Sequence, residues 1–271
     1  MRLAFIGTGS MGSALLAGVI AGGCDPADII ATTHSAASAR ALAAEHGIRT
    51  IAVAEDSAAN RRAASGADYV FLGVKPWAIK DTAAEVGAEL GAEAVLVSMA
   101  AGITLEQLAA SAGHEAVVRI MPNTPSRIGC GVISVSPAEA VAAAQVAPLT
   151  ALLAGAGQVF ELDEELIPAM TGISGSGVAY FFLLAEEMVR AGTAMGLDAE
   201  TAAAMVVKTA EGAGRLLAAD PDPAALRQAV TSKGGTTHAA ITTFQDAGFA
   251  ALVERAAQAA GQRAIAMAEE Y

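Results

Sequence analysis

Short apolar runs alternate with stretches of helical spacing over about the first 160 residues of the chain. Runs of four to six apolar residues, bounded by glycine, proline or polar residues, are typical of strands buried on both faces. With helices between them, such runs predict a doubly wound parallel sheet of the α/β class. The expected strands are residues 3–6, 29–32, 50–53, 69–74, 95–98 and 117–121, with edge strands at 131–135 and 158–160 and a helix at 138–154 between those two.

The alternation of strands and helices ends after Leu162. From Asp163 onward the pattern is helical and is broken only at glycine-rich segments. No change of composition marks a linker at this point. We therefore expect two domains, residues 1–162 with the sheet and residues 163–271 entirely helical.

The first expected strand runs directly into a glycine-rich turn and then into a helical pattern. This is the order that a dinucleotide-binding site needs. The first glycine suits the tight turn, the second lets the backbone approach a diphosphate, and the third lets the helix pack close to the strand. The unpaired amides at the helix start attract phosphate. The pattern predicts a Rossmann-like domain, although a tight turn that binds no ligand is the structural alternative. The predicted cofactor-binding residues of this turn are Gly7, Thr8, Gly9, Ser10, Met11 and Gly12.

The end of the second strand bears on which nucleotide is bound. About 20 residues past the glycines, sites for NAD carry an acidic residue that binds the ribose 2′-hydroxyl. Here residues 31–35 read Ala-Thr-Thr-His-Ser, without an acid, and Arg40 lies a little more than one helical turn further on. Hydroxyls at a helix start and a nearby cation suit a 2′-phosphate, so Thr33, Ser35 and Arg40 are predicted to favour NADP. The alternative is that Ser35 only caps the helix and that Arg40 is solvated.

Three more strands are expected to end on the cofactor side, because ligands of such sheets lie beyond the carboxyl ends of the strands. The first of them is followed by Lys75 and Pro76, the second by Ala100, and the third by Asn123 between two prolines. Those prolines predict a rigid loop that cannot continue the strand. All four residues are predicted beside the cofactor, with a solvated loop lysine as the open alternative for Lys75.

Two small, hydroxyl-rich segments of the helical half each precede a helical pattern. A helix start is an anion site, and because a second phosphate binder would be redundant, a substrate carboxylate is the expected ligand. For residues 172–177 the alternative is tight packing between helices. His238 lies about 100° round the helix from Thr237, so we expect it to be solvated rather than to act as an acid or base. The predicted substrate-binding residues are Ser174 and Ser176 in the first segment and Ser232, Lys233, Gly234, Gly235, Thr236 and Thr237 in the second.

Composition narrows the range of partners and compartments. The net charge of −12 argues against nucleic acid or an anionic membrane surface as partner. Cys24 and Cys130 have no metal-ligand spacing, so no metal site is predicted. We find no apolar run of the roughly 18 residues that a membrane span needs, and the chain begins with a strand rather than a signal peptide. These features predict a cytoplasmic protein.

Together these motifs resemble the pyrroline-5-carboxylate reductases, and the likeness covers nearly the whole chain. The resemblance implies NADPH-dependent hydride transfer to the C=N bond of 1-pyrroline-5-carboxylate, giving L-proline in the last step of proline biosynthesis. NADH stays open as a second donor. The segments that carry the resemblance are residues 6–12, 74–76, 119–125, 172–180 and 230–237.

The resemblance also implies roles for single residues. Asn60 and the turn of Val74, Lys75 and Pro76 are expected to contact the cofactor, and residues 232–237 to hold the substrate carboxylate. Thr237 is the predicted catalytic residue, with its hydroxyl hydrogen-bonded to the ring nitrogen. The helical domain is expected to form intertwined homodimers that assemble further, with the alanine-rich helices over residues 239–268 in the interface.

The sequence departs from the family pattern at two positions, and two other functions stay open as alternatives. Val178 stands where the family usually has proline, and Lys233 stands where it often has proline. Another imine reductase or a β-hydroxyacid-type dehydrogenase is one alternative. The second of these uses a lysine in the helix after the second glycine loop, and Val178–Val189 has none. A non-catalytic NADP-binding protein is the other alternative.

Overall fold

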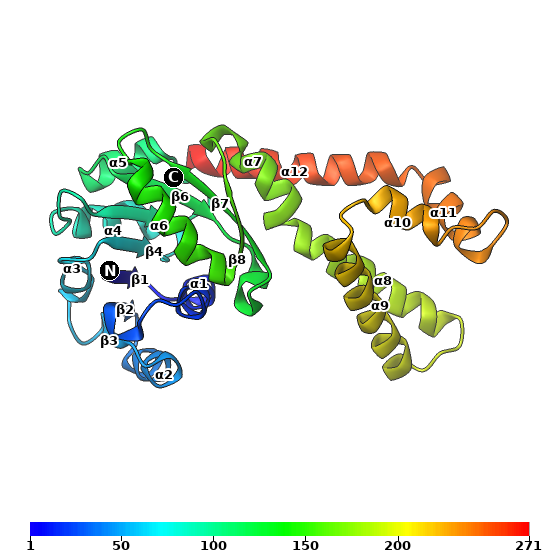
Figure 1. The fold of residues 1–271 in the computed structure, drawn as a ribbon, viewed down its shortest axis with the longest axis horizontal. Coiled ribbons are helices and arrows are strands. Elements are labelled where there is room, and N and C mark those ends of the chain that lie inside the picture. The colour runs from blue at the N-terminus through cyan, green and yellow to red at the C-terminus, as the bar shows by residue number, and fades with distance from the viewer. Residues whose placement is uncertain (271) are drawn as a thin grey trace. The chain divides into compact units, whose positions relative to one another are not determined.

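The computed structural model describes residues 1–270, and the strands of this range form one sheet (Figure 1). Their order across the sheet is β3-β2-β1-β4-β5-β6-β7-β8. Every strand expected from the sequence is present. The strands are β1 (Leu3–Ile6), β2 (Ile29–Thr33), β3 (Arg49–Ala52), β4 (Tyr69–Leu72), β5 (Val95–Ser98), β6 (Val117–Met121), β7 (Gly131–Pro137) and β8 (Gly157–Glu161).

Helices separate the parallel strands and make up the rest of the chain after β8. The predicted change from alternating strands and helices to helices alone is therefore confirmed. The helices are α1 (Ser10–Ala21), α2 (Ala36–His46), α3 (Ala59–Ala64), α4 (Ile79–Gly87), α5 (Leu105–Ala112), α6 (Ala143–Leu153), α7 (Ile167–Met170), α8 (Gly177–Ala194), α9 (Ala199–Ala219), α10 (Pro223–Ala229), α11 (Thr236–Asp246) and α12 (Phe249–Glu270).

Strands β1 to β6 are parallel, as predicted, but β7 runs antiparallel to β6. The connection between β6 and β7 explains the reversal. It holds only the short 3₁₀ helix η3 (Thr124–Ile128), whereas a parallel neighbour needs a crossover of a dozen or more residues. Helix α6 provides such a crossover between β7 and β8, which are parallel to each other.

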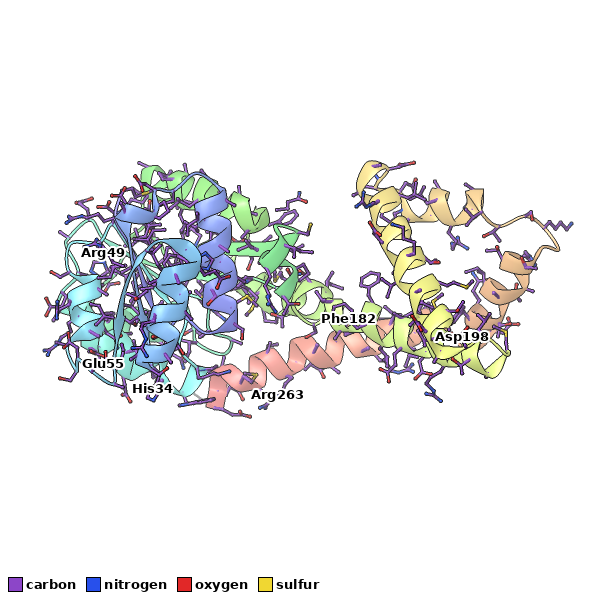
Figure 2. All side chains as sticks on the ribbon, turned by 90° about the horizontal axis from the view of Figure 1, so that it is seen from below. His34, Arg49, Glu55, Phe182, Asp198 and Arg263 are labelled. Carbon is purple, nitrogen blue, oxygen red and sulfur yellow. The ribbon has the colours of Figure 1, made fainter. Side chains whose placement is uncertain are left out.

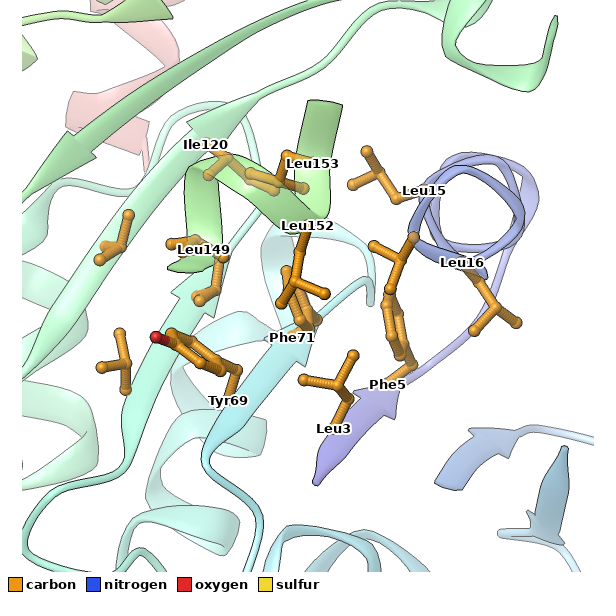
Figure 3. Packing of buried hydrophobic residues seen from close by; sticks show 14 of the residues in the cluster. Leu3, Phe5, Leu15, Leu16, Tyr69, Phe71, Ile120, Leu149, Leu152 and Leu153 are labelled. Carbon is orange, nitrogen blue, oxygen red and sulfur yellow. The ribbon is translucent and has the colours of Figure 1, made fainter. Parts of the chain in front are cut away.

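Helices cover both faces of the sheet. Successive side chains of a strand point to opposite faces, so each strand contributes to two separate cores. Leu3 and Phe5 belong to the core under α1, α2 and α6, whereas Ala4 and Ile6 belong to the core under α3, α4 and α5. In the first core the rings of Phe5 and Phe71 stack with centroids 4.5 Å apart (Figure 3). Double coverage explains why the strands read as continuous apolar runs.

Close packing of α1 depends on Gly18 rather than on Gly12. A Cβ on Gly18 would lie 2.3 Å from the Cβ of Ala156 in the 3₁₀ helix η4 (Ala154–Ala156). A Cβ on Gly12 would meet its nearest neighbour, the Cγ2 of Thr8, at 3.4 Å, which is an ordinary contact. Close packing of α1 on the strand therefore does not require glycine at position 12, and the close contact of α1 is the one that Gly18 makes with η4.

The chain divides into two compact units, which are described separately below. The first contains Met1–Ser176 and the chain from Ala259 onward, and the second is Gly177–Gln258. The predicted boundary at Leu162 lies earlier in the chain. The difference arises because residues after Leu162 pack on the sheet domain: Ile167, for example, belongs to an apolar cluster with residues at the end of β6.

One helical stretch, Glu164–Ala194, contains an 18-residue window whose length and mean hydropathy of 1.4 would suit a membrane span. The expectation that no apolar run reaches this length is therefore wrong. Only 22% of the window is buried within the chain. Length and composition are weak evidence for a span, because a helix that packs its apolar side on another protein chain passes the same test.

Candidate functional site

The glycine turn after β1 has the backbone that the sequence predicted. Gly7 has φ +75°, and a Cβ on it would lie 2.3 Å from the Cγ1 of Val74. Gly7 is therefore required both by its left-handed backbone and by the close approach of the loop after β4. The predicted neighbours Gly7 and Val74 are thus brought together at the carboxyl ends of β1 and β4.

Helix α1 begins at Ser10 with a free N-terminus. Its N-cap is Gly9, no side chain caps it, and no acidic residue occupies its first turn. A Cβ on Gly9 would have no atom within 4 Å. The fold therefore leaves open space in front of the helix amides, where an anion could approach the backbone closely. Thr8, Gly9 and Ser10 line this space.

A chain of hydrogen bonds supports the glycine turn from below. The Gly7 amide donates to the hydroxyl of Thr32 at 3.1 Å, and that hydroxyl donates to the Oδ1 of Asn60 at 2.8 Å. The Nδ2 of Asn60 donates to Glu85 at 2.9 Å. The Thr8 hydroxyl also donates to the Thr32 carbonyl at 2.7 Å. Asn60, expected at the cofactor, thus holds the residue on which the turn rests.

Sequence reasoning missed Thr32, although a hydroxyl residue inside an apolar strand run was a usable signal. Thr32 is fully buried. A buried hydroxyl needs a hydrogen-bond partner, so its presence within a strand next to the glycine turn indicates such a contact.

The end of β2 places hydroxyls at the start of α2. Ser35 is the N-cap, with its side chain accepting from the Ser38 amide at 3.2 Å. Thr33 is buried, and its hydroxyl donates to the Ser35 carbonyl. The alternative that Ser35 caps α2 is confirmed, and a cap does not prevent the hydroxyl from meeting a phosphate. Arg40 is exposed on α2.

A cavity of about 520 Å³ joins the free start of α1 to the end of β2. It brings together Gly9, Ser10 and Thr33 with one arginine, Arg127 of η3. Arg40 is not among its lining residues. Arg127 was not predicted, because it lies far from the glycine turn in sequence and arrives there only through the packing of η3 on α1. The lining residues are Thr8, Gly9, Ser10, Ser13, Ala14, Ala17, Thr33, Ser38, Ala41, Leu42, Glu45, His46 and Arg127.

The remaining strand ends differ in exposure. Lys75 is exposed and precedes the 3₁₀ turn that starts at Pro76. Ala100 is buried, with its amide donating to Ser98. Asn123 is only 5% exposed. Its Oδ1 accepts from the Val132 amide at 2.9 Å, and its Nδ2 faces the backbone and side chain of Ser174.

The segment at residues 172–177 leads into α8 from another helical segment and not from an open loop. Helix α7, a π-helical segment (η6, Thr171–Gly175) and α8 follow one another closely, and the Ser176 amide donates to the Thr171 carbonyl at 2.8 Å. A helix interior has no free amides for an anion. The interpretation of this segment as an anion site at a helix start is therefore wrong, and the hydroxyls of Ser174 and Ser176 are what it can offer.

The second predicted segment does begin a helix. Gly234 has φ +77°, Gly235 is the N-cap of α11, and no side chain caps this helix start. A Cβ on Gly235 would lie 2.6 Å from the Oγ of Ser232. The two glycines therefore permit a tight turn that leaves the amides of Thr236 and Thr237 at the positive end of α11. Ser232, Lys233 and His238 are exposed on this segment, and Thr237 is half-buried.

A partly buried ion pair joins β6 to Glu164. The guanidinium of Arg119, 8% exposed, donates to Glu164 at 2.5 Å, and Glu164 also accepts from the Leu105 amide at 2.8 Å. A cavity of about 730 Å³ next to this pair is lined by several acidic residues and by none of the predicted site residues. Among residues 1–270 no cluster of three His, Cys, Asp or Glu side chains is arranged to hold a metal ion.

Comparison with known proteins gives consistent results for both halves of the chain. Residues 164–267 match the family model for pyrroline-5-carboxylate reductase dimerisation, and residues 2–102 match that for coenzyme F420-dependent NADP oxidoreductases. The sequence is 42% identical to the pyrroline-5-carboxylate reductase of Pseudomonas aeruginosa over 272 residues, covering 99% of this chain and 97% of the relative.

Solved structures agree with the sequence matches. The fold is similar to that of a pyrroline-5-carboxylate reductase from Coxiella burnetii, with a TM-score of 0.89 and 32% identity over 98% of both chains. It is also similar to the fold of Plasmodium falciparum pyrroline carboxylate reductase with NADP bound. In that case the TM-score is 0.85, with 24% identity over 99% of this chain and 98% of the other.

Proposed function

The chain belongs to the pyrroline-5-carboxylate reductase family, and from this premise we propose which of its residues bind and position the reactants. Its activity is the NADPH-dependent reduction of 1-pyrroline-5-carboxylate to L-proline. The reaction converts the C=N bond to a C–N single bond: the imine carbon gains a hydride and the nitrogen keeps or gains a proton. NADPH, when bound, supplies the hydride.

The observation that carries the cofactor site is the open, uncapped start of α1. Gly9 faces empty space, so the fold itself does not require glycine there, whereas close approach of a diphosphate does. We propose that residues 7–12 bind the diphosphate through their backbone. Asn60 supports this turn through Thr32, and Val74 lies against Gly7. Lys75 and Pro76, which follow Val74 in the chain, are proposed to contact the cofactor.

Two arginines are candidates to pair with the negative charges of the cofactor's diphosphate and 2′-phosphate. Arg127 lines the cavity that Gly9 and Ser10 open on, and among residues 1–270 it forms no ion pair. We assign it to the diphosphate. Ser35, which caps α2, and Arg40 on the same helix are proposed for the 2′-phosphate, with Thr33 holding the Ser35 backbone.

The start of α11 is proposed to hold the substrate carboxylate. Its first amides lie at the positive end of the helix dipole, and no acidic residue lies in the first turn of α11. Lys233 adds a positive charge just before the helix. The Thr237 hydroxyl can donate and accept, so it suits the ring nitrogen both as iminium and as product amine. Because the imine can enter already protonated, orientation and charge placement suffice without a strong acid.

The chain is proposed to act as a homo-oligomer built from dimers. Residues 164–267 match a dimerisation domain, and α8 exposes a run of large apolar side chains that includes Phe181, Phe182 and Leu183. Each of these three is at least 60% exposed in the single chain. Phe182 is labelled on α8 in Figure 2. A second copy covering this face also accounts for the apolar window that would otherwise suit a membrane. We propose a cytoplasmic location and no nucleic-acid partner, in line with the net charge of −12.

Replacing Gly9 with alanine tests the cofactor site. We expect the Kd for NADPH, measured by calorimetry, to rise by about 10-fold or more, which corresponds to about 1.4 kcal/mol. The thermal midpoint should stay within about 2 °C of the parent, because the added methyl meets no protein atom. Gly91→Ala is the matched control, since a Cβ there also meets nothing within 4 Å. Unchanged NADPH affinity in Gly9→Ala would refute the assignment.

A further inference from the structure

The side chain of Asn123 bonds the π-helical segment η6 (Thr171–Gly175) from outside the helix. The Nδ2 of Asn123 donates to the carbonyl oxygen of Ser174 at 3.3 Å and to the Ser174 hydroxyl at 3.1 Å. These bonds join positions 51 residues apart. An i→i+5 turn is rare and occurs mostly at functional sites. An external donor to a carbonyl of such a turn therefore bears directly on its register.

The Asn123 side chain is itself rigidly held. It is 5% exposed, and its Oδ1 accepts from the Val132 amide at 2.9 Å. Because that bond identifies the oxygen, the amide nitrogen must face Ser174. Pro122 and Pro125 restrict the backbone on either side. The loop after β6 thus holds the amide nitrogen of Asn123 in a fixed position facing Ser174.

Both hydrogen bonds of the Asn123 amide nitrogen go to Ser174. Its carbonyl oxygen lies 3.3 Å and its hydroxyl oxygen 3.1 Å from Nδ2. The side chain of Asn123 is thus turned toward Ser174, and the cofactor contact that its strand-end position predicts stays a prediction.

We propose that Asn123 is a positioning residue that sets the π register of residues 171–175 and so places the hydroxyls of Ser174 and Ser176. In a π turn the Ser176 amide bonds the carbonyl of Thr171, whereas an α turn would shift that bond to the next carbonyl and turn both side chains. The proposal rests on the proposed function only in assigning these two hydroxyls to the substrate.

The variants Asn123→Asp and Ser126→Ala separate this role from general stability. Aspartate keeps an acceptor for the Val132 amide but loses both donors to Ser174. Ser126 lies in the same loop and is 1% exposed, but its hydroxyl has no hydrogen-bond partner among the described residues. Ser126→Ala is therefore a matched change of a buried polar side chain that leaves the Asn123–Ser174 bonds in place.

We expect Asn123→Asp to lower kcat/KM for 1-pyrroline-5-carboxylate by about 10-fold or more, the effect of losing one hydrogen bond of about 1.4 kcal/mol. The Kd for NADPH should stay within about 2-fold of the parent, and Ser126→Ala should match the parent in both. In a double-mutant cycle with Ser174→Ala the effects should be less than additive. A weakened NADPH affinity with an unchanged substrate KM would overturn the proposal in favour of a direct cofactor contact.

Amide hydrogen exchange gives a readout that does not depend on activity. Exchange at residues 174–177 should become faster in Asn123→Asp and stay unchanged in Ser126→Ala, because only the first loses the bonds that hold the π register. Unchanged exchange in Asn123→Asp would overturn the proposal even if the enzyme were active. An inactive parent protein would instead contradict the proposed function, while exchange would still decide the role of Asn123.

Discussion

Single residues matter most at two helix starts, that of α1 in the first unit and that of α11 in the second. The starts of α1 and α11 share an N-cap glycine, no capping side chain and no acid in the first turn. Helix starts usually satisfy their amides with a serine, threonine, aspartate or asparagine cap. Helices α3, α4 and α7 also have no side-chain cap, but their N-caps are not glycine. A glycine N-cap lets a ligand approach the helix amides closely, which is consistent with a diphosphate at α1 and a carboxylate at α11.

Thr237 is expected to matter for turnover and His238 is not. Losing one hydrogen bond to a charged group costs roughly 1.5–3 kcal/mol, or about 10- to 150-fold in kcat/KM. Thr237→Ala should show this loss while its Kd for NADPH stays normal, and Thr237→Ser should retain most of the activity. His238→Ala should stay within a few-fold of the parent. Steady-state kinetics with 1-pyrroline-5-carboxylate decide between the two residues, and an inactive but folded His238→Ala would make the histidine a general acid instead.

Nucleotide preference can be tested at Ser35 without disturbing α2. Aspartate is as good an N-cap as serine, so Ser35→Asp keeps the bond from the Ser38 amide while adding a negative charge. Repulsion between unit charges about 4 Å apart is roughly 1–4 kcal/mol between bulk water and a protein surface. We expect the ratio of kcat/KM for NADPH over NADH to fall by about 5-fold or more.

Ser35→Asn keeps the cap without the charge and should leave that ratio close to the parent value. The parent protein is expected to prefer NADPH. A lower KM for NADH in the parent would show that the end of β2 does not bind a 2′-phosphate.

At the level of elements, α1 is positioned by glycines that sequence reasoning passed over. Gly18 faces Ala156, and a Cβ on Gly155 would lie 2.0 Å from the Gly18 carbonyl oxygen. The two backbones therefore pack closely, with only the methyl group of Ala156 at the contact. This close packing sets the direction in which α1 points its free N-terminus. The glycine turn after β1 determines the backbone geometry at the start of α1, and the contact of Gly18 with η4 determines the orientation of α1.

Gly18→Ala should destabilise the protein although alanine favours a helix. The new methyl would lie 2.5 Å from the Cα of Ala156, so the helix must shift. Forcing an extra methyl into a packed contact costs about 1–3 kcal/mol, against a gain of up to about 1 kcal/mol in helix propensity. Urea unfolding followed by circular dichroism measures the difference. A more stable Gly18→Ala protein would mean that α1 and η4 can separate at no cost.

On the scale of the whole molecule, the helices after residue 176 cannot bury their apolar surface within one chain. Large apolar side chains are exposed on α8, α9, α11 and α12, with Phe182 67% and Leu252 54% exposed. Surfaces of this kind mark protein interfaces. The alanine-rich helices over residues 239–268 are thus expected to share the dimer interface with α8.

Light scattering at micromolar concentration should give a mass that is a multiple of the 26.9 kDa chain. Phe182→Asp should shift the protein toward smaller species, because a charge in an apolar interface loses its water without gaining a partner. Phe160→Asp is the control: Phe160 is 41% exposed on β8, in the sheet domain. A monomeric parent protein would contradict the proposed assembly.

The sequence alone was sufficient for the features that depend on neighbouring residues. Apolar runs of strand length predicted all eight strands, and the glycine turn predicted the φ of Gly7 and the start of α1. Ser232 to Thr237 was correctly predicted to begin a helix. These features follow from local backbone preferences and from the periodicity of burial, both of which can be read within a short window.

Only the tertiary structure decided which distant groups meet. The bond from Gly7 to Thr32 spans 25 residues and that from Asn123 to Ser174 spans 51. The approach of Arg127 to the glycine turn and the π register at residues 171–175 also follow from packing. No local pattern encodes these pairs, because each depends on how two elements are oriented when their apolar faces are buried together. The same limit explains why a glycine-rich helix segment was predicted as a helix start.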